Sequence, residues 1–172
     1  MTFLEHDDAR NLKKALTQVE EDSRPFGVQY LTRCLYAAVV GDQLDCVRLL
    51  LDAGARPDVH VDVNGQTALI VAVQRGSADI VHALLTAPAN GVDKVSAISR
   101  ATALHWAAAN GDRVCLRLLI DAGANLEARM ASGRTPLMVA ARSDQEGALI
   151  ELIESGEDNR SVVGRKNTSK SS

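Results

Sequence analysis

The sequence predicts an all-α solenoid of about four stacked helix-turn-helix repeats, with a hairpin finger between successive repeats and an extra N-terminal helix. One phrase recurs as Thr67-Ala-Leu-Ile-Val-Ala, Thr102-Ala-Leu-His-Trp-Ala and Thr135-Pro-Leu-Met-Val-Ala, and its threonines are 35 and 33 residues apart. A fixed period of this length indicates stacked supersecondary units. Hydrophobic residues make up 46% of the chain and aromatic residues only 3%, so small aliphatic side chains must form the core. Such side chains suit close packing of helices.

The first segment, residues 1–24, is predicted to be an amphipathic helix. Thr2 can cap it, with Glu5 three residues later as the second half of a capping box. Leu12, Leu16 and neighbouring apolar residues fall near one face. We expect this helix to pack on the first repeat and cover its apolar edge.

The next segments are predicted to be four repeats. Repeat 1 (28–61) is degenerate, with its short helix ended by Gly41. A glycine after a helix supplies the left-handed residue that closes it. Repeats 2 and 3 span 62–96 and 97–129, and repeat 4 (130–156) forms the C-terminal cap.

Three features at the ends of repeats depart from the pattern. Pro88 replaces a glycine after the second repeat, so a bend or an altered exit is expected there. In repeat 4, Asp144 replaces the mid-repeat glycine and Glu151 lies where other repeats carry Leu or Ala. A polar outer face suits a terminal repeat, which no neighbour covers. Residues 157–172 are polar and are predicted to be a disordered tail.

The recurring phrase resembles the ankyrin-repeat signature, Thr-Pro-Leu-His-x-Ala-Ala-x-x-Gly followed by Ile-Val-x-Leu-Leu-Leu-x-x-Gly-Ala. It stands most fully in repeat 3, as Thr102-Ala-Leu-His-Trp-Ala-Ala-Ala-Asn-Gly111 with Leu118-Leu-Ile and Gly123-Ala, and it covers about residues 30–156. The departures are Cys34 for the first leucine, an extra residue between Gly41 and Cys46, Pro88 for a glycine, and Arg100 for the hairpin glycine.

The resemblance implies which positions face a partner protein, namely those beside the hairpin glycine and the two after Ala-Ala. They are Val39, Val40, Val63, Asn64, Gln66, Gln74, Arg75, Ile98, Ser99, Ala101, Ala109, Asn110, Arg134 and Arg142, together with Ala131, Ser132 and Ser143. These residues are apolar, amide, hydroxyl or arginine, and none is acidic. We therefore expect a mildly basic concave groove for an extended or acidic protein segment.

Two residues of repeat 3 have a structural and a functional interpretation. For His105, a partly buried imidazole bonded to nearby backbone is favoured over any chemical role. Trp106 stands where other repeats carry aliphatic residues, so core packing is favoured. The alternative is a partly exposed ring at the centre of the concave face, where Trp is a frequent hot spot.

No cofactor, metal site or catalytic activity is expected. Cys34, Cys46 and Cys115 have neither disulfide nor zinc spacing and are interpreted as buried thiols. Nucleotide-binding, zinc-protease and serine-nucleophile motifs are missing. The net charge of −3 argues against nucleic acid, and no apolar run is long enough to cross a membrane. The N-terminus does not read as a secretory signal, so a cytoplasmic or nuclear location is expected.

The function expected is non-catalytic recognition of another protein, as an adaptor or regulatory subunit, by a monomer or a subunit of a hetero-complex. Two alternatives stay open from the sequence: a structural subunit of a larger assembly, and a host-directed ankyrin effector or inhibitor. An enzyme has no motif in its favour.

Overall fold

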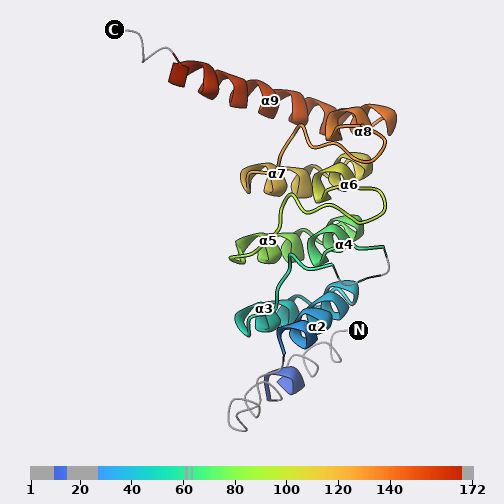
Figure 1. Cartoon of the computed structure of the whole chain (residues 1–172), viewed down its shortest axis with the longest axis vertical. Coiled ribbons are helices and arrows are strands. Elements are labelled where there is room, and N and C mark those ends of the chain that lie inside the picture. Colours follow the sequence, from blue (N-terminus) through green and yellow to red (C-terminus); the bar gives the residue numbers. More distant parts are fainter. Residues whose placement is uncertain (1–9, 15–26, 61, 63, 168–172) are drawn as a thin grey trace.

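The computed structural model of the chain describes residues 10–14, 27–60, 62 and 64–167. Its helices form four antiparallel pairs: α2 (Val28–Val40) with α3 (Leu44–Asp52), α4 (Ala68–Arg75) with α5 (Ala78–Thr86), α6 (Ala103–Asn110) with α7 (Arg113–Asp121), and α8 (Pro136–Arg142) with α9 (Glu146–Asn167). The pairs stack in one direction, with α2, α4, α6 and α8 in one column and α3, α5, α7 and α9 in the other (Figure 1). Helices without strands make up the regular structure of the described residues, which confirms the predicted all-α solenoid.

We call α2, α4, α6 and α8 the inner helices and α3, α5, α7 and α9 the outer helices. The repeated threonine is the residue that precedes and caps an inner helix. The hydroxyl of Thr67 accepts a hydrogen bond from the backbone N–H of Ile70 at 3.3 Å, and that of Thr135 accepts one from Met138 at 3.4 Å. A side-chain oxygen at this place satisfies a backbone donor that the helix leaves unpaired. The period in the sequence therefore marks the beginning of one helix in each of the last three repeats.

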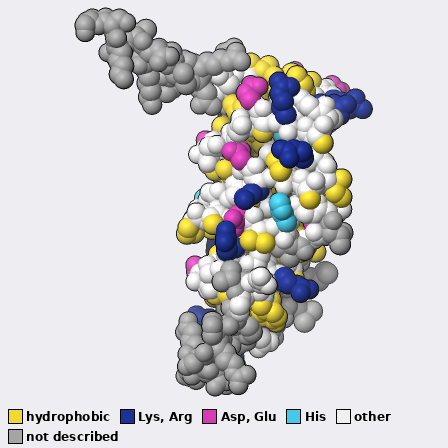
Figure 2. Space-filling model, viewed as in Figure 1, with side chains coloured by type: hydrophobic (Ala, Val, Ile, Leu, Met, Phe, Trp, Pro, Cys, Tyr) yellow, Lys and Arg dark blue, Asp and Glu magenta, His cyan; other side chains and the backbone are white. Residues whose placement is uncertain are grey.

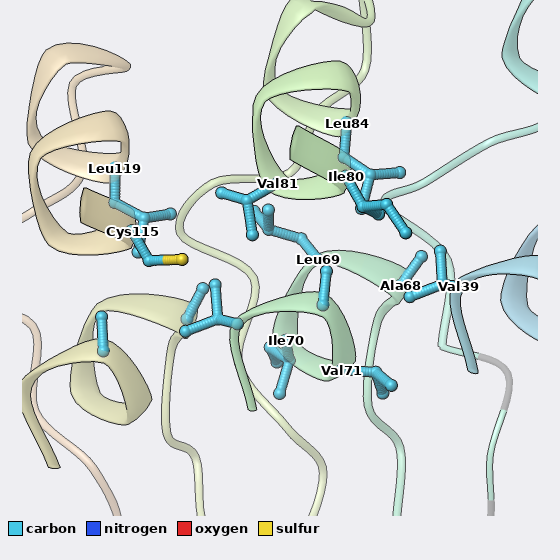
Figure 3. Close-up of a cluster of buried hydrophobic side chains, with 14 of the residues drawn as sticks. Val39, Ala68, Leu69, Ile70, Val71, Ile80, Val81, Leu84, Cys115 and Leu119 are labelled. Carbon is cyan, nitrogen blue, oxygen red and sulfur yellow. The ribbon is translucent and has the colours of Figure 1, made fainter. Parts of the chain in front are cut away.

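The core is continuous along the stack. Ile80, Val81 and Leu84 of α5 project towards Ala68 and Leu69 of α4, and Cys115 and Leu119 of α7 follow in the next pair (Figure 3). The inner helices contribute alanines with no exposed surface, namely Ala72, Ala107, Ala108 and Ala140. Because an alanine side chain is a single methyl group, neighbouring inner helices can approach closely.

The residue that closes each inner helix adopts a left-handed conformation. Gly76 (φ 71°) and Gly111 (φ 68°) do so in repeats 2 and 3, and Asp42 (φ 56°) and Asp144 (φ 55°) take the same place in repeats 1 and 4. Aspartate tolerates this region better than most side chains do. The first helix ends at Gly41 as predicted, but Gly41 keeps a right-handed φ of −80°, and the expected left-handed conformation falls on the next residue, Asp42.

Backbone hydrogen bonds fix how the repeats correspond to one another. After each left-handed residue, the next N–H donates to an alanine carbonyl: Gln43 to Ala38, Ser77 to Ala72, Asp112 to Ala107 and Gln145 to Ala140. The first repeat is therefore shifted by one residue from the match that its sequence suggests. Ala38, not Ala37, corresponds to Ala107, and Asp42, not Gly41, corresponds to Gly111.

The altered exit expected at Pro88 is confirmed. Ala53 and Ala122 close α3 and α7 with φ −76° and ψ of 0° and 1°, so the backbone has not yet become extended. Ala87 closes α5 with ψ 147°, which is extended. The ring of a following proline excludes the helical conformation from the residue before it, so Pro88 accounts for the difference.

The structure describes the two ends of the chain only in part. Residues 10–14 are helical and Leu12 packs against the core, while the rest of the predicted helix over 1–24 lies outside the described residues. A disordered tail was predicted from residue 157; in the structure α9 continues to Asn167, and residues 168–172 lie outside the described residues. Gly156 stays helical, and an interior glycine costs a helix only about 1 kcal/mol.

Candidate protein-binding surface

The hairpin fingers are the loops that connect α3 to α4 (the first finger), α5 to α6 (the central finger) and α7 to α8 (the last finger). These fingers are joined to one another. The backbone N–H of Ala97 in the central finger donates to the carbonyl of Gly65 in the first finger at 3.2 Å. The N–H of Ala131 in the last finger donates to the carbonyl of Ser99 in the central one at 2.8 Å. In Figure 1 the loops project on the same side, beyond the inner helices. The fingers therefore form one row.

The first finger is fixed by Asp62. Its carboxylate accepts hydrogen bonds from the backbone N–H of Gln66 at 2.6 Å and from the hydroxyl of Tyr36 on α2 at 3.2 Å. Burial and the nearby carboxylate both raise the pKa of Tyr36, so its phenol stays protonated and can donate. A side chain of α2 thus positions the finger that precedes α4.

His105 fixes the last finger. Its Nδ1 accepts from the backbone N–H of Thr102 at 3.2 Å, so Nε2 carries the proton and donates to the carbonyl of Arg134 at 3.1 Å. The side chain is buried, and burial lowers its pKa, which favours the neutral ring that this geometry needs. The structural interpretation of His105 is confirmed, and its role is to hold the finger before α8 against α6.

Most of the residues predicted to face a partner are accessible. The exposed ones are Val40, Asn64, Arg75, Ile98, Asn110 and Arg142, and the half-buried ones are Gln66, Gln74, Ser99, Trp106, Ala109 and Arg134. Ile98, at the central finger, is 71% exposed, a high value for a large apolar side chain. Val63 lies outside the described residues.

Two of the predicted contact residues are buried, and their assignment is corrected. Val39 has 0% of its surface exposed and Ala101 has 2%. Val39 is buried because the correspondence in repeat 1 is shifted by one residue: Ala38 and Val39 match Ala107 and Ala108, and Val40 and Gly41 follow them. Gln66 and Arg134 take the place of Ala101 in the other fingers and are half-buried, so Ala101 is buried because its side chain is a single methyl group. Its carbonyl accepts the N–H of Ser96 at 3.0 Å.

Two accessible residues were not among the predicted contacts. Gly41 is exposed, and the shift in repeat 1 makes it the equivalent of Arg75 and Asn110. Arg100 is exposed at the turn of the central finger with φ 54°, in the place of a hairpin glycine. The signal for Arg100 was present in the sequence, as a charged side chain where the other fingers have none.

Trp106 packs against the core and is also partly accessible. The ring is half-buried and packs against the core, as the structural interpretation requires. Its indole N–H is buried and finds no hydrogen-bond acceptor in the part of the chain that the structure describes. Buried indole N–H groups usually have a partner, so this position is unusual for a side chain that only fills a core.

The accessible charges among the predicted contacts are all positive. Neither Arg75 nor Arg142 forms an ion pair with any described residue, while Arg134 donates to the hydroxyl of Ser132 at 3.3 Å. Figure 2 shows Lys and Arg side chains recurring along the stack, with Asp and Glu between them. Arg75 and Arg142 could therefore pair with an acidic partner segment without first breaking an ion pair to a described residue.

A separate depression of about 400 Å³ lies between the outer helices α3 and α5. It is lined by Arg48, Leu51, Asp52, His82, Ala83, Thr86, Ala87 and Pro88. Repeats 1 and 3 carry Leu49 and Leu118 at the position of Ala83. The smaller side chain and the exit altered by Pro88 together account for the hollow.

The described residues contain no group of His, Cys, Asp or Glu that could hold a metal ion, and no helix long and apolar enough to cross a membrane. Cys46 and Cys115 are buried, Cys34 is half-buried, and none of the three forms a disulfide. Burial raises the pKa of Cys115 to about 12, so this thiol is protonated and unreactive.

The stacked helix pairs and their linked hairpins define a helical-repeat protein with an extended exposed surface. Residues 11–98 and 87–162 match the family model described as ankyrin repeats (3 copies). The chain therefore belongs to the ankyrin-repeat family. Repeats of this family are generally protein–protein interaction modules, and the family is typically non-catalytic.

Curated relatives share the repeats over part of their length. The chain is 38% identical over 113 residues to the B-cell lymphoma 3 protein homolog of Mus musculus, covering 64% of this chain and 25% of the relative. It is 36% identical over 117 residues to a putative ankyrin repeat-containing protein of Treponema pallidum, covering 68% and 38%. It is 39% identical over 105 residues to the neurogenic locus notch homolog protein 4 of Homo sapiens, covering 60% and 5%. The chain thus spans well under half of these relatives.

Proposed function

We propose that the chain is an adaptor or regulatory subunit that holds an extended or acidic segment of a partner protein in the groove beside its finger row. The groove comprises the finger surface, defined here by the exposed residues Asn64, Arg75, Ile98, Asn110 and Arg142. The observation that carries the proposal is the hydrogen-bonded row of fingers, which carries Asn64 and Ile98 and lies beside the helices that end with Arg75, Asn110 and Arg142. Varied loops on a rigid scaffold are where binding usually resides.

The charge of the finger surface supports an acidic partner segment. Arg75 and Arg142 come from different repeats and are exposed, and neither forms an ion pair with a described acidic residue. A segment that reached both would have to run along the stack, which is what an extended peptide does. The three thiols, none of which is in a disulfide, support a reducing location in the cytoplasm or nucleus.

The test starts with affinity purification from native extract, followed by titration of the recovered partner. Purification with Arg75→Ala and Trp106→Ala variants should lose the same co-purifying protein. Reversing both charges, Arg75→Glu with Arg142→Glu, should weaken affinity by about tenfold or more. Arg48→Glu, on outer helix α3, is the matched control and should change affinity little. Unchanged affinity after the double reversal would sink the proposal.

A second candidate function is a permanent structural subunit of a larger assembly. Ile150 and Ile153 favour it, because they are exposed on the outer helix α9. A subunit of this kind should associate or aggregate when purified alone. Sedimentation velocity that shows a stable monomer over a wide concentration range would count against it.

A further inference from the structure

The end of the stack formed by α8 and α9 carries an apolar surface. Leu137 and Met138 on α8 and Ile150 and Ile153 on α9 are all exposed, and these four residues are called the terminal surface here. Met138 is 50% exposed, whereas its equivalent in repeat 3, His105, is 2% exposed under the following repeat. No described residue covers the terminal surface in the same way, since α9 runs on away from the stack (Figure 1).

The terminal surface is the reverse of what a water-facing end requires. A terminal repeat needs a polar outer face, because no neighbour covers it. Repeats 1, 2 and 3 have Arg48, His82 and Arg117 at one outer-helix position, and Ile150 takes that position in repeat 4. Glu151, which was predicted to suit an exposed end, is instead buried against α7. The acidic side chain is turned inward and the apolar ones outward, so this end is built to be covered.

Acidic residues border the apolar ones on α9. Glu146, Ile150, Ile153 and Glu154 are spaced at i, i+4, i+7 and i+8, which places them on one stripe of the helix. Both glutamates are exposed, and neither forms an ion pair with a described residue. A complementary surface therefore carries apolar side chains with Lys or Arg at both ends.

The same stripe argues against a second copy of this chain as the occupant. In a two-fold antiparallel pairing of α9 with α9 centred on Ile150, Glu146 of one copy would face Glu154 of the other. Like charges placed directly opposite one another at an interface are unfavourable. In the interior of the stack, by contrast, each helix pair is covered by helices, and Arg113 and Arg117 face Glu151 across that boundary.

We infer that the terminal surface binds an amphipathic helix of a partner protein, with basic residues flanking its apolar stripe. This site is separate from the finger surface and does not depend on the function proposed for it. The helix packs over α8 and α9 as those helices pack over α6 and α7, with the charge pattern at the boundary reversed.

The test uses two labelled helical peptides of about 18 residues, long enough to form a helix on binding. Both carry leucine at i, i+3, i+4 and i+7, and the flanking positions are lysine in one and glutamate in the other. Fluorescence anisotropy with the full chain should show that the basic peptide binds at least about tenfold more tightly. Equal binding of the two peptides, or binding of neither, overturns the inference.

Variants locate the binding site. Glu154→Lys and Ile150→Arg should each weaken the basic peptide by about tenfold, and the arginine restores the residue type of Arg48 and Arg117. Asp121→Lys is the matched control, because Asp121 is exposed at the position of α7 equivalent to Glu154. Equal loss with Asp121→Lys and Glu154→Lys overturns the inference, since it would show a general effect of charge. Circular dichroism confirms that each variant is folded.

Two further measurements exclude the other occupants. The finger-surface variant Arg75→Glu with Arg142→Glu should bind the basic peptide at least as well as the unaltered chain, which separates this site from the proposed function. Sedimentation equilibrium should show that the unaltered chain is not a dimer held together by the terminal surface, that is, a dimer that Ile150→Arg would dissociate. Such a dimer would identify a second copy as the occupant and overturn the inference.

Discussion

Glu151 of α9 accepts a hydrogen bond from Arg117 of α7, with its Oε1 only 2.6 Å from the guanidinium Nε. Its second oxygen lies 3.3 Å from Nη2 of Arg113. The carboxylate is buried while both arginines keep most of their side chains in solvent. The third and fourth repeats are therefore joined by charge as well as by apolar packing.

The first prediction concerns the pH dependence of this contact. The hydrogen bond from Arg117 holds the pKa of Glu151 below its ordinary value, in spite of burial. The carboxylate therefore stabilises the fold above its unfolded pKa of about 4.3, and this contribution is lost as the pH falls towards the folded pKa. Glu151→Gln should melt a few degrees lower at pH 7, and the difference should shrink below about pH 4.3.

A matched variant separates charge from packing in that experiment. Glu151→Leu introduces the side chain that repeats 1 and 3 carry as Leu49 and Leu118. Replacing a buried ion pair by an apolar residue is often neutral or stabilising, so the leucine variant should melt near the unaltered chain. Thermal melts followed by circular dichroism measure all three proteins. A glutamine variant that kept the same difference at every pH would contradict the assignment.

The second prediction concerns His105, which acts in a different pH range. Burial lowers its pKa, so the unfolded chain takes up a proton at a pH where the folded chain does not. Stability is therefore full above the unfolded pKa of about 6.5 and falls as the pH drops below it. Urea unfolding between pH 7.5 and 5, about one unit or more on either side of the unfolded pKa, should show the free energy of unfolding falling as the pH drops. His105→Gln should be less stable by about 1–3 kcal/mol and should lose the slope.

The sequence predicted the helices well because they repeat an apolar pattern, and because Thr67, Asp112 and Thr135 cap α4, α7 and α8 with their side chains. It failed where one residue decides the correspondence between repeats. Gly41 looked like the helix-closing glycine, but Asp42 holds the left-handed conformation. Pattern matching favours glycine at such a place, whereas the backbone accepts aspartate. The misplacement of Val39 follows directly from this shift.

Some features of the last repeat could not be predicted from the sequence, because they depend on contacts with another repeat. Whether Glu151 faces water or α7 is decided by Arg113 and Arg117, which lie on another repeat. The continuation of α9 past Gly156 could not be derived either, because a glycine permits the turn that closes a helix but does not require it. Local composition alone does not distinguish these outcomes.

The third prediction concerns the closest approach between fingers. Gly65 has φ 62°, and a Cβ built on it would collide with the methyl group of Ala97. Gly65→Ala should therefore lower the free energy of unfolding by about 2–4 kcal/mol, from backbone strain and overpacking together. Gly133→Ala is the control, since Gly133 has φ 78° with nothing within 4 Å of its Cβ. It should lose only about 1 kcal/mol.

The outcome for Gly65 also reports on the finger row. Ala97 is the residue whose N–H donates to the carbonyl of Gly65, so a larger side chain should separate these two fingers. Amide hydrogen exchange at Ala97 should become faster in Gly65→Ala and stay unchanged in Gly133→Ala. Equal losses of stability in the two variants would mean that the fingers are not packed as closely as described.

The fourth prediction concerns the depression between α3 and α5. Ala83→Leu supplies the side chain that Leu49 and Leu118 provide in neighbouring repeats, and it should fill the hollow beside His82 and Pro88. Filling such a space commonly raises the free energy of unfolding by about 1 kcal/mol. Ala37→Leu, on an exposed face of α2, makes the same change of side chain without a hollow to fill and should give no gain. A lower stability for Ala83→Leu, measured by urea unfolding, would show that the altered exit at Pro88 leaves no room for the larger side chain.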